Sequence, residues 1–150
     1  MISGVKIKMI KTHSDERGYF REILRIDDGL LKHIGQSSVS LTKPGLVKAF
    51  HWHKNQDETF YVLSGKAQVV LHDLRKKSKT YRQTNTLTMG EDEQKLLLIP
   101  RKVAHGYKVL GKKPLVMLYA MNKAYNKDSP DEKRIPHDDK GINFNWAKYK

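Results

Sequence analysis

Short runs in which apolar and polar residues alternate make up most of this chain, and turn residues separate the runs. Residues 5–10 (VKIKMI) and 36–42 (QSSVSLT) place every second side chain on one face, which is typical of β-strands. Further extended runs are predicted at residues 47–53, 59–63, 67–71, 81–89, 95–100, 103–110 and 115–121. Glycine, proline and polar clusters between them predict tight turns. The pattern therefore predicts an all-β barrel or sandwich of about nine short strands.

The length and the pattern favour a single domain spanning residues 1–150, which is enough chain to bury a core. After residue 125 the composition becomes polar, and we expect a tail loop over about residues 126–141. No apolar stretch approaches the roughly 18 residues of a membrane span, and the N-terminus lacks the apolar segment of a signal peptide. We therefore expect a cytoplasmic protein with no membrane partner. The absence of cysteine fits a reducing compartment and excludes thiol catalysis.

The formal net charge of +13 narrows the possible partners. Lysine and arginine are scattered singly or in pairs along the chain, with one short basic run in a predicted turn at residues 75–77. A nucleic-acid surface requires a basic helix, or a basic strip with aromatic residues between the charges. We therefore expect no nucleic-acid partner, and the excess charge favours a smaller anion such as a phosphate-bearing metabolite.

The candidate chemistry lies in residues 45–65 (GLVKAFHWHKNQDETFYVLSG). If residues 47–53 form a strand, His51 and His53 share one face, while Phe50 and Trp52 share the opposite face and pack in a core or interface. Imidazole titrates near neutral pH and is also a common metal ligand. The pair therefore predicts either an acid–base site or a metal site, although one histidine by itself is more often a buried polar side chain.

The spacing of glycine, two histidines, glutamate and glycine in this stretch resembles the first motif of the cupin superfamily. Residues 99–109 (IPRKVAHGYKV) resemble the second motif, but Lys102 stands where cupins usually have glycine, and Val109 where asparagine is common. The resemblance implies an all-β cupin jelly-roll barrel of antiparallel strands with little helix. It also implies a possible divalent metal (zinc, iron, nickel or manganese), because three imidazoles and one carboxylate suit these ions. The matching positions are His51, His53, Glu58 and His105.

A narrower resemblance covers residues 14–146. Six segments, in order, resemble signature segments of the dTDP-4-dehydrorhamnose 3,5-epimerase family: residues 15–22 (DERGYFRE), 45–53 (GLVKAFHWH), 62–81 (VLSGKAQVVLHDLRKKSKTY), 99–110 (IPRKVAHGYKVL), 118–125 (LYAMNKAY) and 134–146 (RIPHDD…INFNW). This resemblance implies a nucleotide-diphosphate sugar as substrate, surface-polysaccharide or deoxysugar biosynthesis as context, and no required cofactor. It also implies a homodimer, in which the DERGYF segment of one subunit reaches the cavity of the other.

The epimerase resemblance also implies roles for individual residues. A 4-keto group acidifies the protons at C3 and C5 of the sugar, so that a base can form an enolate and an acid can return a proton on the other face. His51 matches the family's catalytic base and Tyr119 its acid. Positions that match substrate contacts are Arg17, Phe20, Glu22, Gln36, Lys48, His105 and Tyr125.

Several departures from the family leave alternatives open. A family lysine is replaced by Glu58, an arginine by Lys48 and a glutamine by His53, and these changes favour a metal-capable site. The aspartate that pairs with the family's catalytic histidine lies in a C-terminal segment beyond Lys150, and Asp57 and Glu58 are the candidates for replacing it.

Two other functions are therefore considered. The first is a sugar-nucleotide 3,4-ketoisomerase, whose R-G-G-H-A-H-K motif residues 49–54 (AFHWHK) resemble, or another metal-dependent cupin enzyme. The second is a cupin that binds sugar nucleotides without catalysis.

Overall fold

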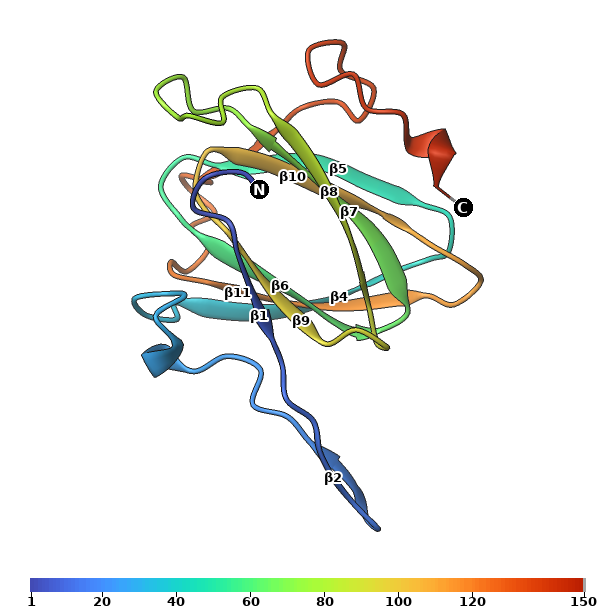
Figure 1. Ribbon diagram of the computed structural model, residues 1–150. Coiled ribbons are helices and arrows are strands. Elements are labelled where there is room, and N and C mark those ends of the chain that lie inside the picture. Colours follow the sequence, from blue (N-terminus) through green and yellow to red (C-terminus); the bar gives the residue numbers. More distant parts are fainter. Residues whose placement is uncertain (150) are drawn as a thin grey trace.

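The computed structural model describes residues 1–149 and contains two five-stranded antiparallel sheets that face each other (Figure 1). The first sheet consists, in spatial order, of β1 (Lys6–Met9), β9 (Lys95–Ile99), β6 (Glu58–Ser64), β11 (Leu115–Met121) and β4 (Gln36–Thr42). The second consists of β12 (Glu132–Arg134), β5 (Val47–His53), β10 (Val103–Val109), β7 (Lys66–Asp73) and β8 (Thr84–Gly90). The predicted all-β architecture is confirmed.

Four short elements complete the described chain. Strands β2 (His13–Asp15) and β3 (Gly18–Phe20) form a separate hairpin, which extends away from the two sheets (Figure 1). The 3-10 turns η1 (Ile26–Asp28) and η2 (Trp146–Lys148) are the only helical elements among residues 1–149. None of the described helical segments is long and apolar enough to cross a membrane.

The predicted polar tail loop over about residues 126–141 contains one short strand that the prediction did not include. Strand β12 lies within this segment and pairs with the edge of β5, with Glu132 opposite His53 and Arg134 opposite His51. Phe50 and Ile135 exchange two backbone hydrogen bonds of 2.8 and 3.0 Å directly beyond this pairing. An edge strand needs backbone pairing but no apolar alternation, and for this reason the polarity pattern did not reveal it.

The space between the sheets is apolar at one end and polar at the other. Alternate residues of β10 point inward, and Val103, Tyr107 and Val109 belong to the central apolar cluster. The same inward row contains His105, which is buried but lies on the wall of a cavity. Strand β6 follows the same rule, with Phe60 and Val62 in the cluster and Glu58 on the cavity wall. A packed core thus holds the strands that carry the polar side chains.

An irregularity in β5 decides which of its side chains reach the cavity. His105 pairs with His51, but Tyr107 pairs with Lys48, so β5 uses one more residue than β10 between these two pairs. An extra residue shifts the side chains beyond it to the other face of the strand. Lys48 and His51 are three positions apart and would face opposite sides of a regular strand. Because of the extra residue, both line the cavity.

Gly106 is required where β10 passes this irregularity. A Cβ atom added there would lie 2.3 Å from the Cβ atom of Ala49 and 2.8 Å from the carbonyl oxygen of Lys48. We expect Gly106→Ala to displace β5, to lower the free energy of unfolding by about 1–3 kcal/mol and to lower activity more than stability alone explains. Urea unfolding together with steady-state kinetics measures both effects. Gly111→Ala, whose Cβ meets no atom within 4 Å but whose φ of +70° strains alanine, is the control for a destabilising loss of glycine that does not displace β5. Unchanged activity in Gly106→Ala would contradict this role.

The outer face of the second sheet is covered by the C-terminal segment. The ring of Phe50 lies 5.5 Å from that of Trp146, and Trp52 packs against the same cluster. This confirms that Phe50 and Trp52 face away from the two histidines of β5. The segment fixes β5 from behind, so the histidine side chains are presented on a supported strand.

Candidate active site

A cavity of about 650 Å³ opens between the two sheets at the polar end of the barrel. Its size is that of a small-molecule site. Strands β4, β6 and β11 form one wall and β5 and β10 the other, while residues 121–133 border the mouth. Of the residues predicted from sequence, the cavity brings together Gln36, Lys48, His51, His53, Glu58, His105, Tyr119 and Tyr125.

Three predicted substrate contacts lie elsewhere in this subunit. Arg17 and Phe20 are on the β2–β3 hairpin, where Arg17 pairs with Asp15 at 2.6 Å and Phe20 is 63% exposed. Glu22 follows the hairpin and pairs with Arg25 at 2.6 Å. The cavity of the same chain does not include any of the three. Their assignment as substrate contacts stays a prediction that requires a second subunit.

His51 is paired with a carboxylate that the sequence reasoning missed. Its Nδ1 atom lies 3.1 Å from Oε1 of Glu132, and the Nε atom of Arg134 donates to the same oxygen at 2.9 Å. Burial lowers the pKa of His51 below its ordinary value, and the charge of Glu132 partly opposes this effect. A neutral imidazole whose Nδ1 proton is held by Glu132 leaves Nε2 free to accept a proton.

The two carboxylates proposed from sequence as partners of His51 have other contacts. Asp57 accepts the backbone N–H of Arg101 at 2.8 Å and also receives the Arg101 side chain. Glu58 is turned toward His53 and His105. The expectation that either would pair with His51 in place of the family's aspartate is therefore wrong. The only signal for Glu132 is the pairing of β12 with β5, which brings a residue 81 positions along the chain beside His51.

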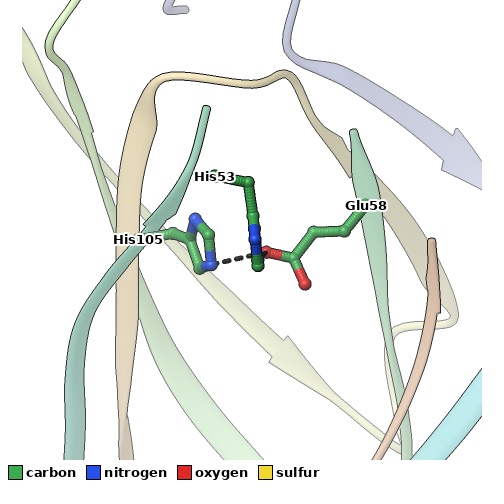
Figure 2. A group of neighbouring side chains, drawn as sticks. All are labelled: His53, Glu58 and His105. Carbon is green, nitrogen blue, oxygen red and sulfur yellow. Dashed lines mark ion pairs between the residues drawn. The ribbon is translucent and has the colours of Figure 1, made fainter. Parts of the chain in front are cut away.

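His53, Glu58 and His105 form a buried cluster, drawn in Figure 2. Glu58 Oε1 lies 2.5 Å from Nε2 of His105 and 3.3 Å from Nε2 of His53. Burial by itself would raise the pKa of Glu58 and lower that of His105. Their mutual attraction outweighs burial, so the pKa of Glu58 is lowered and that of His105 is raised. Three of the four predicted metal ligands are thus brought together, and His51 lies outside the group found among the described residues.

Tyr119 reaches the cavity from the first sheet and ends in a chain of hydroxyl groups. Its hydroxyl lies 2.8 Å from Oγ of Ser40 and 3.1 Å from the hydroxyl of Tyr107. The Tyr107 hydroxyl in turn lies 2.9 Å from Oγ1 of Thr42. Burial is the main cause that raises the pKa of Tyr119 above its ordinary value. The residue is therefore a protonated, oriented hydroxyl, which is a suitable state for a general acid.

The cavity is also lined by lysines. Lys48 is a predicted substrate contact, and Lys54, Lys123 and Lys133 are further lining residues that the sequence pattern does not indicate. These lysines share the lining of the cavity with the acidic residues Asp131 and Glu132. Ammonium groups around a concave site raise the local concentration of anions. The arrangement suits a ligand that carries phosphate outside the reacting part.

Comparisons of the whole chain agree with this site. The family model described as dTDP-4-dehydrorhamnose 3,5-epimerase matches residues 1–150. The Bacillus subtilis (strain 168) spore coat polysaccharide biosynthesis protein SpsL is 55% identical over 146 residues, which is 97% of each chain. The probable low-salt glycan biosynthesis epimerase Agl13 of Haloferax volcanii is 33% identical over 147 residues, covering 97% of this chain and 94% of its own.

Solved structures show the same fold. A dTDP sugar isomerase from Desulfovibrio desulfuricans G20 superimposes with a TM-score of 0.92 at 28% identity, covering 99% of this chain and 94% of its own. A Legionella pneumophila dTDP-6-deoxy-D-glucose-3,5-epimerase in complex with dTDP-4-keto-L-rhamnose gives 0.85 at 26% identity, covering 97% and 79%. The predicted jelly roll is thereby confirmed. This chain belongs to the dTDP-4-dehydrorhamnose 3,5-epimerase family and is a sugar-nucleotide epimerase.

Proposed function

We propose that this epimerase inverts C3, or both C3 and C5, of a dTDP-4-keto-6-deoxy sugar during synthesis of a surface polysaccharide. The observation that carries the proposal is that His51 and Tyr119 line the same cavity from opposite sheets. The names of the spore coat and glycan biosynthesis relatives support the biological context. A cytoplasmic location, expected from the sequence, stays a prediction.

The first half of the reaction is assigned to His51. Its Nε2 atom takes the proton from the carbon beside the keto group, and the pair of electrons left behind moves to the keto oxygen as an enolate. Glu132 holds Nδ1 and stabilises the imidazolium that forms. The lysines that line the cavity hold the diphosphate and lower the energy of the negative charge on the enolate.

The second half is assigned to Tyr119 on the opposite wall. Its hydroxyl returns a proton to the carbon from the other face, which inverts the centre and leaves a tyrosinate. The hydroxyl groups of Ser40 and Tyr107 lie within hydrogen-bond distance of that oxygen and can donate to it. Tyrosinate formation is thereby made less unfavourable in a buried position.

Glu132 is testable as the residue that positions the base. We expect Glu132→Ala to lower kcat roughly 10- to 100-fold with a smaller change in KM, because the imidazole loses its orientation and charge partner. Glu132→Gln keeps an acceptor for the Nδ1 proton and should recover part of the loss. Arg134→Ala, which removes only the contact that steadies Glu132, should cost less than either. Wild-type kcat in Glu132→Ala would contradict this role.

The substrate class is tested by offering matched ligands. Calorimetric binding of dTDP, UDP and dTTP separates the nucleotide requirement from the diphosphate requirement. Conversion of dTDP-4-keto-6-deoxyglucose, followed by NMR, then identifies the product. Inversion at C3 or C5 is the expected result, whereas a carbonyl moved from C4 to C3 would establish a ketoisomerase. Tight binding without any conversion would establish a binding protein.

We also propose that the protein acts as a homodimer in which the β2–β3 hairpin completes the neighbour's cavity. The hairpin extends away from its own barrel and exposes Tyr19 and Phe20, at 66% and 63% (Figure 1). The edge strand β4 exposes Val39 and Leu41 on its outer face, at 60% and 61%. Exposed apolar side chains on an unpaired edge are typical of a surface that binds another chain. The hairpin would then supply Arg17, Phe20 and Glu22 to the other subunit.

Subunit complementation tests the shared site. We expect Arg17→Ala and His51→Asn homodimers to be weakly active, because each cavity lacks one contribution. A mixed dimer has one cavity with both wild-type contributions, so random co-assembly should restore about a quarter of wild-type activity. Co-expression with two affinity tags, followed by kinetics on each population, measures this. Activity no higher than that of the parents would show that the hairpin serves its own subunit or none.

A further inference from the structure

We propose that His53, Glu58 and His105 bind one divalent first-row transition-metal ion, and that His51 is not among the ligands. The three side chains come from β5, β6 and β10, and one ligand atom of each lies within 4.8 Å of the others (Figure 2). The inference goes beyond the proposed epimerisation, in which the proton transfers use only His51 and Tyr119. It also differs from the four-ligand set expected from sequence.

The distances fit a metal site after a small adjustment. Ligand bonds of about 2.0–2.2 Å at tetrahedral angles separate two ligand atoms by roughly 3.3 Å. His53 Nε2 and Glu58 Oε1 are already 3.3 Å apart. His105 Nε2 and Glu58 Oε1 are 2.5 Å apart and must separate by about 1 Å or less, which small side-chain rotations can provide.

The hydrogen bond made by Nδ1 of His105 leaves Nε2 available as a metal ligand. Nδ1 lies 3.0 Å from the backbone carbonyl of Val103, so this nitrogen carries the proton that it donates. Metal-bound histidines usually donate their second ring nitrogen to a carbonyl or carboxylate in this manner. In the neutral ring, the lone pair of Nε2 then faces the carboxylate of Glu58. Two electron-rich atoms at this distance require a cation between them.

A proton can meet that requirement for His105 but not for the whole cluster. Glu58 Oε1, which faces both imidazoles, is buried and has no partner of hydrogen-bond geometry, whereas the unpartnered Nδ1 of His53 is not the nitrogen that faces Glu58. His53 is 8% exposed, and the nearest further carboxylate is that of Asp131, 3.9 Å from Nδ1. Buried polar groups without partners are rare in folded proteins and point to an absent ligand or ion. One divalent ion would satisfy the facing atoms of all three residues, whereas one proton bridges a single pair.

The donor set and its position indicate what kind of site this would be. Two imidazoles and one carboxylate suit zinc, iron, manganese, cobalt or nickel better than magnesium or calcium. Three protein ligands leave at least one coordination position, and the three residues line the cavity that we assign to the substrate. A bound ion would supply Lewis-acid stabilisation of negative charge on a ligand oxygen. His51 pairs instead with Glu132 and is not part of the group.

Metal binding to the full chain tests the inference without an activity assay. The protein is stripped with a chelator, dialysed, and titrated with Zn²⁺ and Co²⁺ by calorimetry, while the melting temperature is followed. We expect one equivalent per chain and a rise in melting temperature that increases with metal concentration. In protein labelled with ¹⁵N-histidine, Zn²⁺ should shift the Nε2 signals of His53 and His105 and leave the ring of His72 unchanged. This native-protein readout does not depend on a variant that folds.

The variants separate the three-ligand site from its alternatives. Glu58→Gln and His53→Asn should weaken binding by more than about 100-fold, since even residues that only support a ligand change affinity 10- to 100-fold. His51→Asn should bind Co²⁺ within about twofold of wild type. Equal losses in His51→Asn and His53→Asn would overturn the three-ligand assignment in favour of four ligands. Binding of less than a tenth of an equivalent, or binding that Glu58→Gln leaves unchanged, would overturn the metal site itself.

Discussion

Replacing His51 by asparagine is expected to lower kcat by at least about 10³-fold while the protein remains folded. General-base catalysis contributes roughly 10²- to 10⁴-fold, and no other neutral imidazole in the cavity is held with a carboxylate on Nδ1 and a free Nε2. The side chain is only half-buried, so its loss leaves no large void. NMR detection of the epimerised product, combined with thermal melting, separates catalysis from stability.

A matched control for this change is His72→Asn. His72 lies on β7, contacts Thr84 and does not line the cavity, so its replacement should leave kcat within about twofold. His51→Asn with more than a tenth of wild-type kcat would contradict the assignment of His51 as the base. Such a result would direct attention to His53 and His105, the other two imidazoles that line the cavity.

Replacing Tyr119 by phenylalanine is expected to separate two events that normally occur together. His51 can still remove the proton, exchange it with solvent and return it to the same face, so hydrogen exchange should persist. Inversion requires an acid on the other face and should fall by about 10²-fold or more. In deuterated water the variant should therefore give labelled but uninverted substrate. A parallel loss of exchange and inversion would contradict a role for Tyr119 on one face only.

The hydroxyl chain behind Tyr119 provides graded comparisons. Tyr107→Phe removes one of two donors to the tyrosinate and should lower inversion by about tenfold, because one such hydrogen bond to a charged oxygen contributes roughly 1.5 kcal/mol. Tyr61→Phe is the matched control, since Tyr61 is equally buried but its hydroxyl contacts Gln94 away from the cavity. We expect this control to lose stability without losing catalysis. Equal losses of inversion in the two variants would exclude a specific role for Tyr107.

The strands and the histidine pair could be predicted from sequence because they obey a local rule. Strands β4, β5 and β11 have the bounds that alternation predicts, and His51 and His53 face the cavity while Phe50 and Trp52 face away. Backbone geometry alone imposes this alternation, so one stretch of sequence is enough to read it. The epimerase resemblance predicted Gln36, Tyr119 and Tyr125 as further site residues, and all three line the same cavity.

The partner of His51 could not be predicted because it depends on pairing between distant segments. Glu132 stands in a polar stretch without periodicity, and only the short edge strand β12 brings it to His51. The sequence also could not show that three of the four predicted metal ligands cluster while His51 does not, and the reason is similar. The extra residue of β5 between Lys48 and His51 sets how the histidines lie relative to β10, and a change of register leaves no local signal in the sequence.

Some of the resemblance marks structure rather than chemistry. In the segment at residues 73–80, the carboxylate of Asp73 is fully buried and accepts hydrogen bonds from Arg75, Ser78 and Thr80. These contacts hold the turn after β7, at a distance from the residues that line the cavity. A family signature therefore identifies the fold with certainty and the reaction only through the residues that reach the cavity.

Hydrogen exchange at carbon tests the central claim, enolate formation by His51, most directly. Wild-type protein and His51→Asn are incubated with dTDP-4-keto-6-deoxyglucose in deuterated water, each after chelation and after addition of metal. Deuterium at C3, or at C3 and C5, in the wild type and its loss in His51→Asn is the predicted result, and dependence on metal would connect the buried cluster to the same step. Wild-type protein that binds the sugar nucleotide but exchanges neither hydrogen would contradict the account.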